Sequence, residues 1–442
     1  MIDLLCHTIP AFQALTDDCP WQPLRWQLQA MAVADLFPQT AQWQTDLIAG
    51  RNGDRAMAVL TALPADSRAW SVDDWLKALP LLLAIDQTVH GVSVGKLVAA
   101  AGIIPSGPIL AESEHAMLLR RGPLRRPDRE IDVIPDAPQD LLIGVIVVKK
   151  RFAGAAVRVE RPRFYRPAEA PRTIGFVPAI ECAEELVLTE LPPTGATRPR
   201  IRVEPVADTA VTERIVAATL RCVDKADWVI LPESCVRPET YDAMVKALFK
   251  RNAATSLVIA GSGCYDGFNR VHVLGPGGRE LWRQDKLRLW SVPLNQLSGW
   301  LHGPPAYPPP HDEATDIGDT ITLIDLPVVG RILVAICEDL ERDDGPLREV
   351  IHRTRSDWIL SPIFDTGTGV KRWSGKRALD LSGHGATVVV AAPTGLARLE
   401  RPGDKKVTIG LIARAGQATH TRPVPASKAG TGIHRILPVP PP

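Results

Sequence analysis

The chain lacks the cysteine spacing that marks disulfide-rich and zinc-binding proteins. Its seven cysteines are odd in number, scattered, and never separated by two residues as C-x-x-C: Cys6, Cys19, Cys182, Cys222, Cys235, Cys264 and Cys337. This pattern indicates neither a disulfide framework nor a zinc knuckle. A reducing compartment, the cytoplasm, is the predicted location.

Long apolar runs are also missing. The longest, residues 81–85 and 141–148, are far shorter than the roughly 20 residues that a helix needs to cross a bilayer. The first residues carry acidic side chains early and no basic segment, unlike a secretory signal. The sequence therefore predicts neither export nor membrane anchoring.

No charge of one sign dominates the chain. Lysine plus arginine (51) nearly balances aspartate plus glutamate (50), so no long-range field favours nucleic acid or an anionic membrane. We expect a small substrate, weakly charged or neutral, and no nucleic-acid or membrane partner. Aromatic residues make up only 5%, whereas 40 prolines indicate many turns and linkers.

The length of 442 residues exceeds one ordinary core and predicts two domains. Residues 1–135 are expected to form a mainly α-helical domain of unknown role, whose protein partner the sequence does not identify. Residues 136–171 are expected to form a β-hairpin around Ala153-Gly154 and a Pro/Arg-rich linker. Residues 172–435 form the predicted second domain, and 436–442 a Pro-rich tail.

From about residue 200 onward, short apolar strands alternate with amphipathic helices. Strands are expected at 201–206, 228–231, 256–260, 271–274, 280–284, 332–336, 358–362 and 387–392, and helices at 211–223, 239–252, 345–355 and 373–384. Residues 275–278, Gly-Pro-Gly-Gly, are a strong hairpin turn. This alternation predicts a layered α/β domain.

Three polar residues of this region each follow an apolar strand, where layered α/β folds expose functional side chains. They are Glu233 in LPES, Lys286 in RQDKL and Cys337 in VAICED. A thiolate can attack a carbonyl or nitrile carbon, an ammonium can stabilise the charge that develops, and a carboxylate can transfer protons. Each residue alone is ordinary, whereas the ordered set indicates catalysis.

The motifs around these residues resemble the nitrilase superfamily of carbon-nitrogen hydrolases over roughly residues 200–425. The matching segments are 214–233 with Pro232-Glu233, 268–286 with the hairpin and Lys286, Ile336-Cys337-Glu338-Asp339, and the helix-strand segment 372–395. The resemblance implies an α/β fold, a nitrilase-like α-β-β-α sandwich, which often forms homo-oligomers. It also implies no cofactor and no metal.

Carried over residue by residue, the resemblance makes Cys337 the nucleophile, Glu233 the proton-transferring base and Lys286 the stabiliser of the tetrahedral intermediate. The backbone N–H of Glu338 is expected to complete the oxyanion site, and Asp339 to orient the turn. Asn269, Trp290 and Trp373 are the predicted pocket residues. A papain-like pairing of Cys337 with His352 or His384 is a weaker alternative.

One position departs from the family pattern. Many members have a second glutamate about ten residues beyond the lysine, and Gln296 occupies that region here. Either Gln296 supports the lysine by hydrogen bonds, or Glu313 reaches the site from the Pro-rich loop. Likewise Trp282, Trp290, Trp300 and Tyr307 are expected either to line a pocket or to pack in the core.

Two functions of different class follow. The first is a cysteine-dependent hydrolase, amidase-like, that cleaves a small non-peptide amide, carbamoyl compound or nitrile through a thioester or thioimidate. The second is a catalytically weak nitrilase-like module for binding or assembly, regulated by the N-terminal domain.

Overall fold

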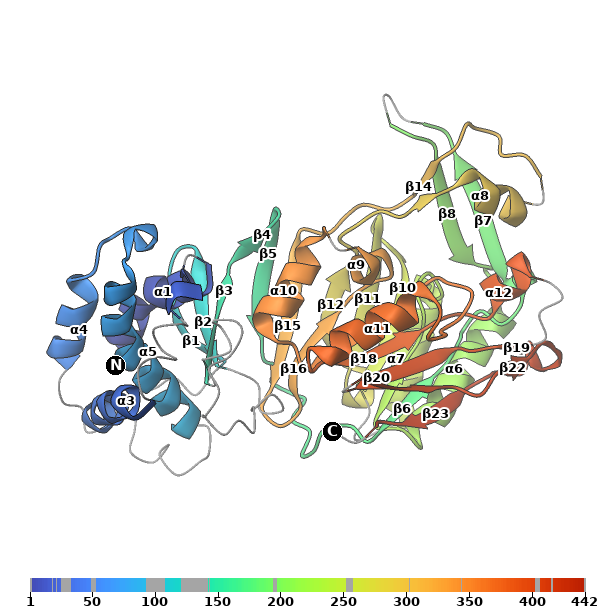
Figure 1. Cartoon of the computed structure of the whole chain (residues 1–442). Helices are drawn as coiled ribbons and strands as arrows, with labels where there is room; N and C mark the ends of the chain where they lie inside the picture. Colours follow the sequence, from blue (N-terminus) through green and yellow to red (C-terminus); the bar gives the residue numbers. More distant parts are fainter. Residues whose placement is uncertain are drawn as a thin grey trace. The chain divides into compact units, whose positions relative to one another are not determined.

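The computed structural model divides the chain into two compact units, and each is described by itself. It describes residues 2–17, 19–20, 22–24, 33–48, 53–92, 108–120, 142, 144–193, 197–251, 257–301, 303–342, 344–401, 406–414 and 416–440. The first unit comprises Met1–Phe152 with Arg353–Arg355, and the second Ala153–His352 with Ser356–Pro442. Figure 1 gives the labels of their elements.

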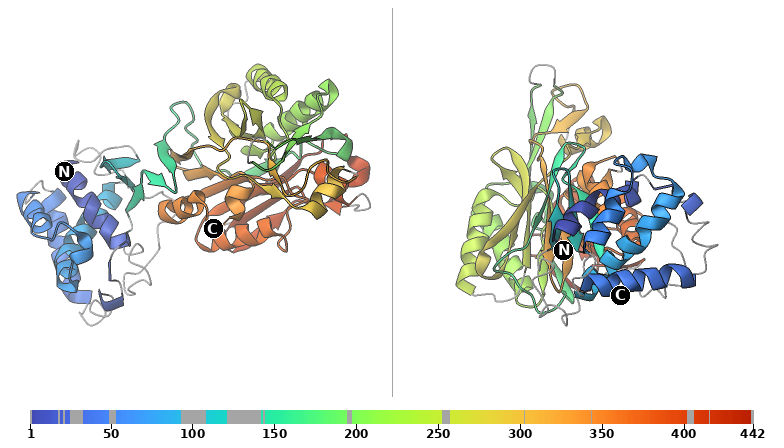
Figure 2. Two further views of the ribbon diagram at one scale, coloured as in Figure 1. Left: turned by 90° about the horizontal axis from the view of Figure 1, so that it is seen from above. Right: turned by 90° about the vertical axis from the view of Figure 1, so that its left-hand side faces the viewer.

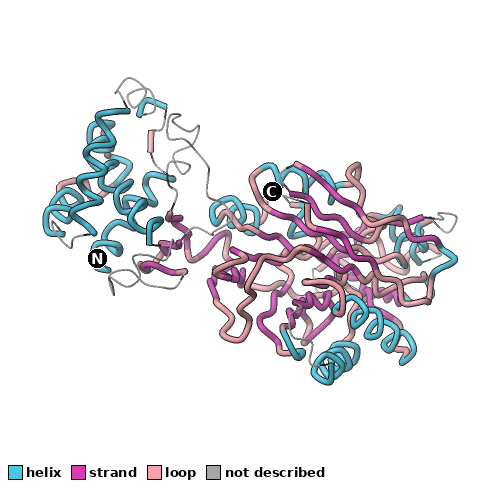
Figure 3. The backbone as a smooth tube through the Cα atoms, turned by 90° about the horizontal axis from the view of Figure 1, so that it is seen from below, coloured by secondary structure: helices cyan, strands magenta, loops and turns pink. Residues whose placement is uncertain are grey.

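The first unit is mostly helical, as the sequence predicts (Figure 3). Its helices are α1 (Ile2–Asp17), α3 (Val33–Ile48), α4 (Gly53–Thr61) and α5 (Val72–Val92). Leu5, Phe12, Trp75 and Leu82 are buried in their shared core. An antiparallel sheet of β1 (Ile109–Glu112), β2 (Ala116–Arg120) and β3 (Val145–Lys149) was not foreseen. Residues 121–141 and 143 lie outside the described residues, which removes the end of the expected helical domain and the start of the expected segment 136–171 from the description.

The hairpin expected around Ala153-Gly154 is short. It joins β4 (Arg151–Phe152) to β5 (Ala155–Glu160), and both turn residues have positive φ angles, 45° and 90°. The apolar run before it, β3, belongs to the sheet of the first unit instead. The compact units thus divide at Phe152, between the limits of 135 and 171 predicted from the sequence.

Two large sheets form the second unit. The six-stranded sheet has the order β12-β11-β10-β9-β6-β23, and the eight-stranded sheet β21-β20-β18-β17-β16-β15-β5-β4. The first contains β6 (Thr173–Phe176), β9 (Trp228–Ile230), β10 (Leu257–Tyr265), β11 (Phe268–Leu274), β12 (Glu280–Asp285) and β23 (Arg435–Pro438). Besides β4 and β5, the second contains β15 (Thr320–Leu326), β16 (Gly330–Val334), β17 (Trp358–Pro362), β18 (Thr387–Ala391), β20 (Gly410–Arg414) and β21 (Gln417–His420).

The inner faces of these sheets share one apolar core. Trp228 of the first sheet and Trp358 of the second meet there with ring centroids 4.8 Å apart. Helices α6 (Thr209–Val223) and α7 (Pro238–Arg251) cover the outer face of the six-stranded sheet. Helix α11 (Trp373–Gly383) packs on β18 and β20 of the other. Figure 2 shows these layers, which confirm the predicted α-β-β-α sandwich.

The local sequence explains why the layers form. Strands β9, β17 and β18 are buried along their whole length, because they are covered on both faces and consist largely of β-branched and aromatic residues. Helix α6 begins where the Asp208 carboxylate accepts a hydrogen bond from the Ala210 N–H, and its apolar stripe faces the sheet.

A smaller, four-stranded sheet was foreseen only at its strand β8. Its order is β13-β14-β8-β7, with β7 (Leu186–Leu191), β8 (Arg200–Pro205), β13 (Ser291–Val292) and β14 (His311–Glu313). Helix α8 (Leu294–Leu301) lies between β13 and β14 in the chain. We call these strands the small sheet. It stands beside the sandwich at the upper right of Figure 1.

The segment predicted as a Pro-rich tail begins inside the sandwich. Strand β23 pairs antiparallel with β6, from Arg435 opposite Phe176 to Pro438 opposite Thr173. It is an edge strand of its sheet, which is where a proline is tolerated in place of a hydrogen-bond donor.

Among the described helices, none has the length and apolar character needed to cross a membrane.

The contact between the sheets should dominate the stability of the second unit. Trp358→Ala removes a fully buried side chain and should lower the free energy of unfolding by about 3–5 kcal/mol. Phe249→Ala, at a residue that is 74% exposed on α7, should change it by less than about 0.5 kcal/mol. Calorimetry of the full chain measures both, and equal effects would contradict a core shared by the two sheets.

Candidate active site

The structure brings together the three residues that the motifs singled out. Glu233 follows β9 and Lys286 follows β12 of the six-stranded sheet, whereas Cys337 follows β16 of the other sheet. The Lys286 Nζ donates a hydrogen bond of 2.7 Å to Glu233 Oε1. The Glu233 carboxylate also lies in hydrogen-bond contact with the Cys337 thiol. All three side chains are buried, so water competes little with these interactions.

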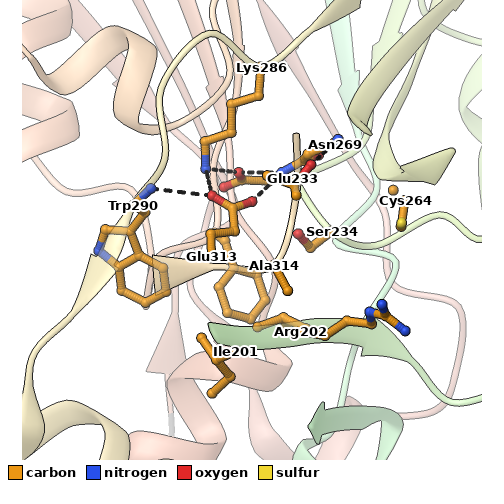
Figure 4. A pocket seen from close by; sticks show the side chains of 14 residues that line it. Ile201, Arg202, Glu233, Ser234, Cys264, Asn269, Lys286, Trp290, Glu313 and Ala314 are labelled. Carbon is orange, nitrogen blue, oxygen red and sulfur yellow. Dashed lines mark hydrogen bonds and ion pairs between the residues drawn. The ribbon is translucent and has the colours of Figure 1, made fainter. Parts of the chain in front are cut away.

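A second carboxylate completes the surroundings of the lysine. Glu313, the last residue of β14, accepts a 2.5 Å hydrogen bond from Lys286 Nζ through Oε2. The backbone of Glu313 is held by its own N–H, which donates to the Trp290 carbonyl at 2.9 Å. The ammonium of Lys286 therefore lies between two carboxylates that come from different sheets (Figure 4).

Asn269 on β11 joins the two carboxylates to each other. Its Nδ2 donates to Glu233 Oε1 at 2.9 Å and to Glu313 Oε1 at 2.7 Å. The Asn269 carbonyl accepts the Lys286 N–H at 2.9 Å, so the same residue also fixes the backbone of the lysine. Its Oδ1 is buried and has no partner among the described residues. The opposite amide orientation would place this oxygen against two carboxylates, which is unfavourable.

The turn at Cys337 has an unusual backbone. Cys337 has φ 46° and ψ −100°, a conformation that costs about 1–3 kcal/mol for a residue other than glycine. Its N–H donates to the Pro362 carbonyl at 3.0 Å, which holds it in place. Among the described residues no carbonyl accepts the N–H of Glu338, which begins the short helix α9 (Glu338–Glu341). This N–H stands next to the thiol and remains available as a donor.

Burial and charge shift the pKa values of the three groups. Burial raises the pKa of Glu233, and the nearby Lys286 only partly offsets that effect. Burial would lower the pKa of Lys286, but Glu233 and Glu313 outweigh it, so the pKa lies well above its ordinary value. Burial and then the Glu233 charge raise the pKa of the Cys337 thiol. At neutral pH the resting site therefore holds a thiol and an ammonium.

Asp339 ties the turn of the cysteine to the strand end of the lysine. Its carboxylate accepts hydrogen bonds from the Leu287 N–H at 3.1 Å and, more loosely, from the Ile336 N–H at 3.4 Å. Burial raises the pKa of Asp339 to about 7, although Lys286 and the two amides oppose the shift. Asp339 thus contacts both segments, and its orienting role stays a prediction.

A pocket opens beside the cluster. It encloses about 480 Å³, part of which is open solvent, and its lining includes Glu233, Lys286 and Glu313 but not Cys337, which lies behind them in contact with Glu233. Asn269 and Trp290, two of the predicted pocket residues, line it, together with Phe364. Among the described residues no group of three or more histidine, cysteine, aspartate or glutamate side chains is arranged to hold a metal ion.

Other predicted residues lie elsewhere. Gln296 on α8 donates through Nε2 to Glu400 at 2.9 Å, so the structure does not bring it to Lys286. Trp373 begins α11 and is not among the residues that line the pocket. The Glu338 side chain binds Arg342 Nε at 2.5 Å, away from its own N–H.

The histidines and tryptophans divide between the site and the core. His352 and His384 pack against each other with ring centroids 5.1 Å apart, and the groups found around Cys337 are Glu233, Lys286 and the Phe364 N–H. Trp282 lies in the core between the sheets. Trp300 packs on Trp290 at 5.2 Å and so supports the pocket wall from behind.

The sequence reveals Glu313 only as one of two alternatives. It stands 27 residues beyond Lys286 in the chain, after a Pro-rich segment, and its strand has three residues. The strand is fixed by parallel pairing with β8, Glu313 opposite Ile201, and antiparallel pairing with β13. A contact of this kind carries no local sequence signal.

Comparison with known proteins gives structural similarity only. No protein-family model matches the chain, and no curated protein matches its sequence. Nit3 of Saccharomyces cerevisiae, a member of branch 10 of the nitrilase superfamily, is 14% identical over 62% of this chain and 91% of its own, with a TM-score of 0.37. An amidase from Nesterenkonia sp. is 14% identical over 61% of this chain and 90% of its own, with a TM-score of 0.38.

A glutamine-dependent NAD+ synthetase from Acinetobacter baumannii is 12% identical over 60% of this chain, with a TM-score of 0.37. The chain spans 45% of that protein. Members of the nitrilase superfamily are thus among the solved structures to which this chain is similar.

The buried ammonium should be essential for the stability of the cluster. Lys286→Met leaves two carboxylates close together without a cation, which should cost about 3–5 kcal/mol at pH 8. Without the ammonium, burial and the neighbouring carboxylate raise the folded-state pKa of Glu233 still further above its unfolded value. The loss should therefore shrink as pH falls toward the unfolded pKa.

Calorimetry of the full chain at pH 5 and pH 8 measures this dependence. Lys246→Met, at an exposed residue of α7, is the matched control and should show little loss at either pH. A Lys286→Met loss that is the same at both pH values would contradict the charge argument.

Proposed function

We propose that this protein is a cysteine-dependent carbon-nitrogen hydrolase of the nitrilase superfamily that acts on a small non-peptide amide. The observation that carries the proposal is the buried Lys286 ammonium between Glu233 and Glu313, beside the Cys337 thiol and an open pocket. A purely structural ion pair needs one carboxylate for one ammonium, and it needs neither a strained thiol nor a pocket.

In the first step, Glu233 accepts the thiol proton as Cys337 Sγ attacks the substrate carbonyl carbon. Proton transfer during attack is required because the pKa of the thiol is raised, so little thiolate exists beforehand. The carbonyl oxygen becomes an oxyanion, which the Lys286 ammonium and the free Glu338 N–H are placed to stabilise. The carbon-sulfur bond has then formed, the thiol proton has moved to Glu233, the carbonyl π electrons have moved to the oxygen, and the carbon-nitrogen bond is still intact.

Collapse of this intermediate breaks the carbon-nitrogen bond. Glu233 returns the proton to the departing nitrogen, so ammonia or an amine leaves and a thioester remains on Cys337. Glu233 then removes a proton from water, which attacks the thioester. The products are a carboxylic acid and the restored thiol. For a nitrile, the same attack gives a thioimidate, and two waters are consumed before the acid is released.

Glu313 and Asn269 have positioning roles in this scheme. The second carboxylate keeps Lys286 protonated while Glu233 alternates between its charged and neutral forms, because one negative neighbour remains at every step. Asn269 fixes the position of both carboxylates by donating a hydrogen bond to each. Since Glu313 is present, the replacement of the expected glutamate by Gln296 does not leave the lysine with a single acid.

The thioester itself provides the most direct test. The full chain is mixed with a panel of small amides, carbamoyl compounds and nitriles, quenched in acid, and examined by intact-mass spectrometry and ammonia release. We expect an acyl adduct on Cys337 and turnover that Cys337→Ala abolishes. Cys222→Ala, at a buried cysteine of α6, is the control and should retain turnover. Absence of adduct and ammonia across the panel would favour the binding-module alternative.

Asn269 offers a second test through pH dependence. Asn269→Ala removes hydrogen bonds to charged groups worth about 1.5–3 kcal/mol, so kcat should fall by about 10- to 100-fold. Glu233 must be ionised to act as the base, and loss of the donor raises the pKa of its carboxyl further. The acidic limb of kcat/KM against pH should therefore move to higher pH. A fall in kcat with an unmoved limb would indicate a structural role only.

A further inference from the structure

Part of the pocket lining is apolar. Its apolar side chains belong to Ile201, Val203, Trp290, Ala314 and Phe364. Val203 stands two residues beyond Ile201, which lies opposite Glu313 in the sheet register, so these three side chains share one face of the small sheet. A substrate whose amide group faces the catalytic cluster therefore meets hydrocarbon beside it.

The two aromatic rings of this lining are supported from behind by Trp300. The ring centroid of Trp300 lies 5.2 Å from that of Trp290 and 6.0 Å from that of Phe364. Trp300 is only 2% exposed and belongs to a core cluster that also contains Ile201. The adjoining strand β13 fixes the backbone of Trp290 by pairing with β14, whereas the contact with Trp300 positions its ring.

One carboxylate anchors Trp300 in turn. Glu400, the last residue of α12 (Gly395–Glu400), accepts hydrogen bonds through Oε1 from Trp300 Nε1 at 3.0 Å and from Gln296 Nε2 at 2.9 Å. The two donors stand one turn apart on α8, so this single oxygen fixes both the position and the rotation of the helix. A buried indole N–H without an acceptor is unfavourable, so the Trp300 ring depends on Glu400 for its place.

Glu400 acts at a distance from the substrate. It does not line the pocket, and the described hydrogen bonds of its carboxylate are made with α8. Its influence on a ligand must therefore pass through Trp300 to the rings of Trp290 and Phe364. The catalytic cluster is held separately, by Asn269 and by the strand ends that carry its members.

We propose that Glu400 is a positioning residue that sets the preference of the pocket for amides with an apolar acyl chain. Through Trp300 it holds the rings of Trp290 and Phe364 in the place where that chain packs. This inference rests on the proposed hydrolase function and narrows its substrate to neutral amides whose acyl group extends beyond two carbons. It keeps the neutral ligand that the balance of charges in the sequence predicts.

The test compares two neutral amides, acetamide and hexanamide, which differ by four methylene groups. We expect the natural protein to prefer hexanamide by about 10- to 100-fold in kcat/KM, because burial of one methylene contributes up to about fourfold. Glu400→Leu removes the acceptor at similar side-chain size. It should reduce this preference by about tenfold, mainly through a higher KM for hexanamide, and should change kcat/KM for acetamide by less than about threefold.

Glu400→Gln is the conservative variant, because both hydrogen bonds end on Oε1 and a glutamine keeps an oxygen acceptor there. It should keep the preference within about threefold. Glu213→Leu, the same exchange at an exposed position of α6, is the matched control and should keep both rates. Equal losses for the two amides in Glu400→Leu would indicate a general structural defect and overturn the inference. Hydrolysis of hexanamide no faster than acetamide by the natural protein would overturn it as well.

A double-mutant cycle tests the route through Trp300. Trp300→Phe keeps an aromatic ring but removes the Nε1 donor, so it should reduce the preference for hexanamide by itself. If Glu400 acts through this indole, adding Glu400→Leu to Trp300→Phe should reduce the preference little further. Independent, multiplicative losses would contradict this route.

Binding separates recognition from chemistry. In a titration of Cys337→Ala with hexanamide, followed by ligand-observed NMR, the further change Glu400→Leu should weaken binding by about tenfold. Absence of turnover of both amides together with absence of a Cys337 adduct would count against the hydrolase function. Binding of hexanamide that depends on Glu400 would in that case still support the positioning role, whereas binding that Glu400→Leu leaves unchanged, or no binding, would overturn it.

Discussion

The candidate site of the second unit depends on one interaction, the buried contact of the Lys286 ammonium with two carboxylates. An unpaired charge is costly to bury, so each of these buried groups needs an oppositely charged or hydrogen-bonding partner in the folded state. Glu233 comes from the six-stranded sheet and Glu313 from the small sheet. The same contact thus joins two sheets, sets the resting protonation of the site and positions the groups that face Cys337.

Much of the sandwich could be predicted because its signals are local. Strands such as β9 and β18 are short apolar runs, and α6 shows helical spacing after an aspartate cap. Glu233, Lys286 and Cys337 could be singled out because each directly follows such a strand. Catalysis by these residues stays a prediction, whereas their proximity in space is observed.

The parts that could not be predicted rely on contacts between distant segments. Strand β14 has three residues and owes its place to pairing with β8, more than a hundred residues earlier, so Glu313 carried no pattern of its own. Gln296 was chosen by counting residues from the lysine, and its helix points it to Glu400 instead. The apolar run β3 could not be assigned to a sheet, because the sequence of a strand does not determine which other strand pairs with it.

The small sheet contributes a residue to the site without belonging to either of the two large sheets. The sandwich provides Cys337, Glu233 and Lys286, whereas β14 of the small sheet, paired with β8, provides Glu313. Substitutions on the outward-facing residues of β8 can accumulate without disturbing the hydrophobic interior. Substitutions on β8 can therefore change the pocket at low risk to folding, provided that the pairing of Glu313 with Ile201 is kept.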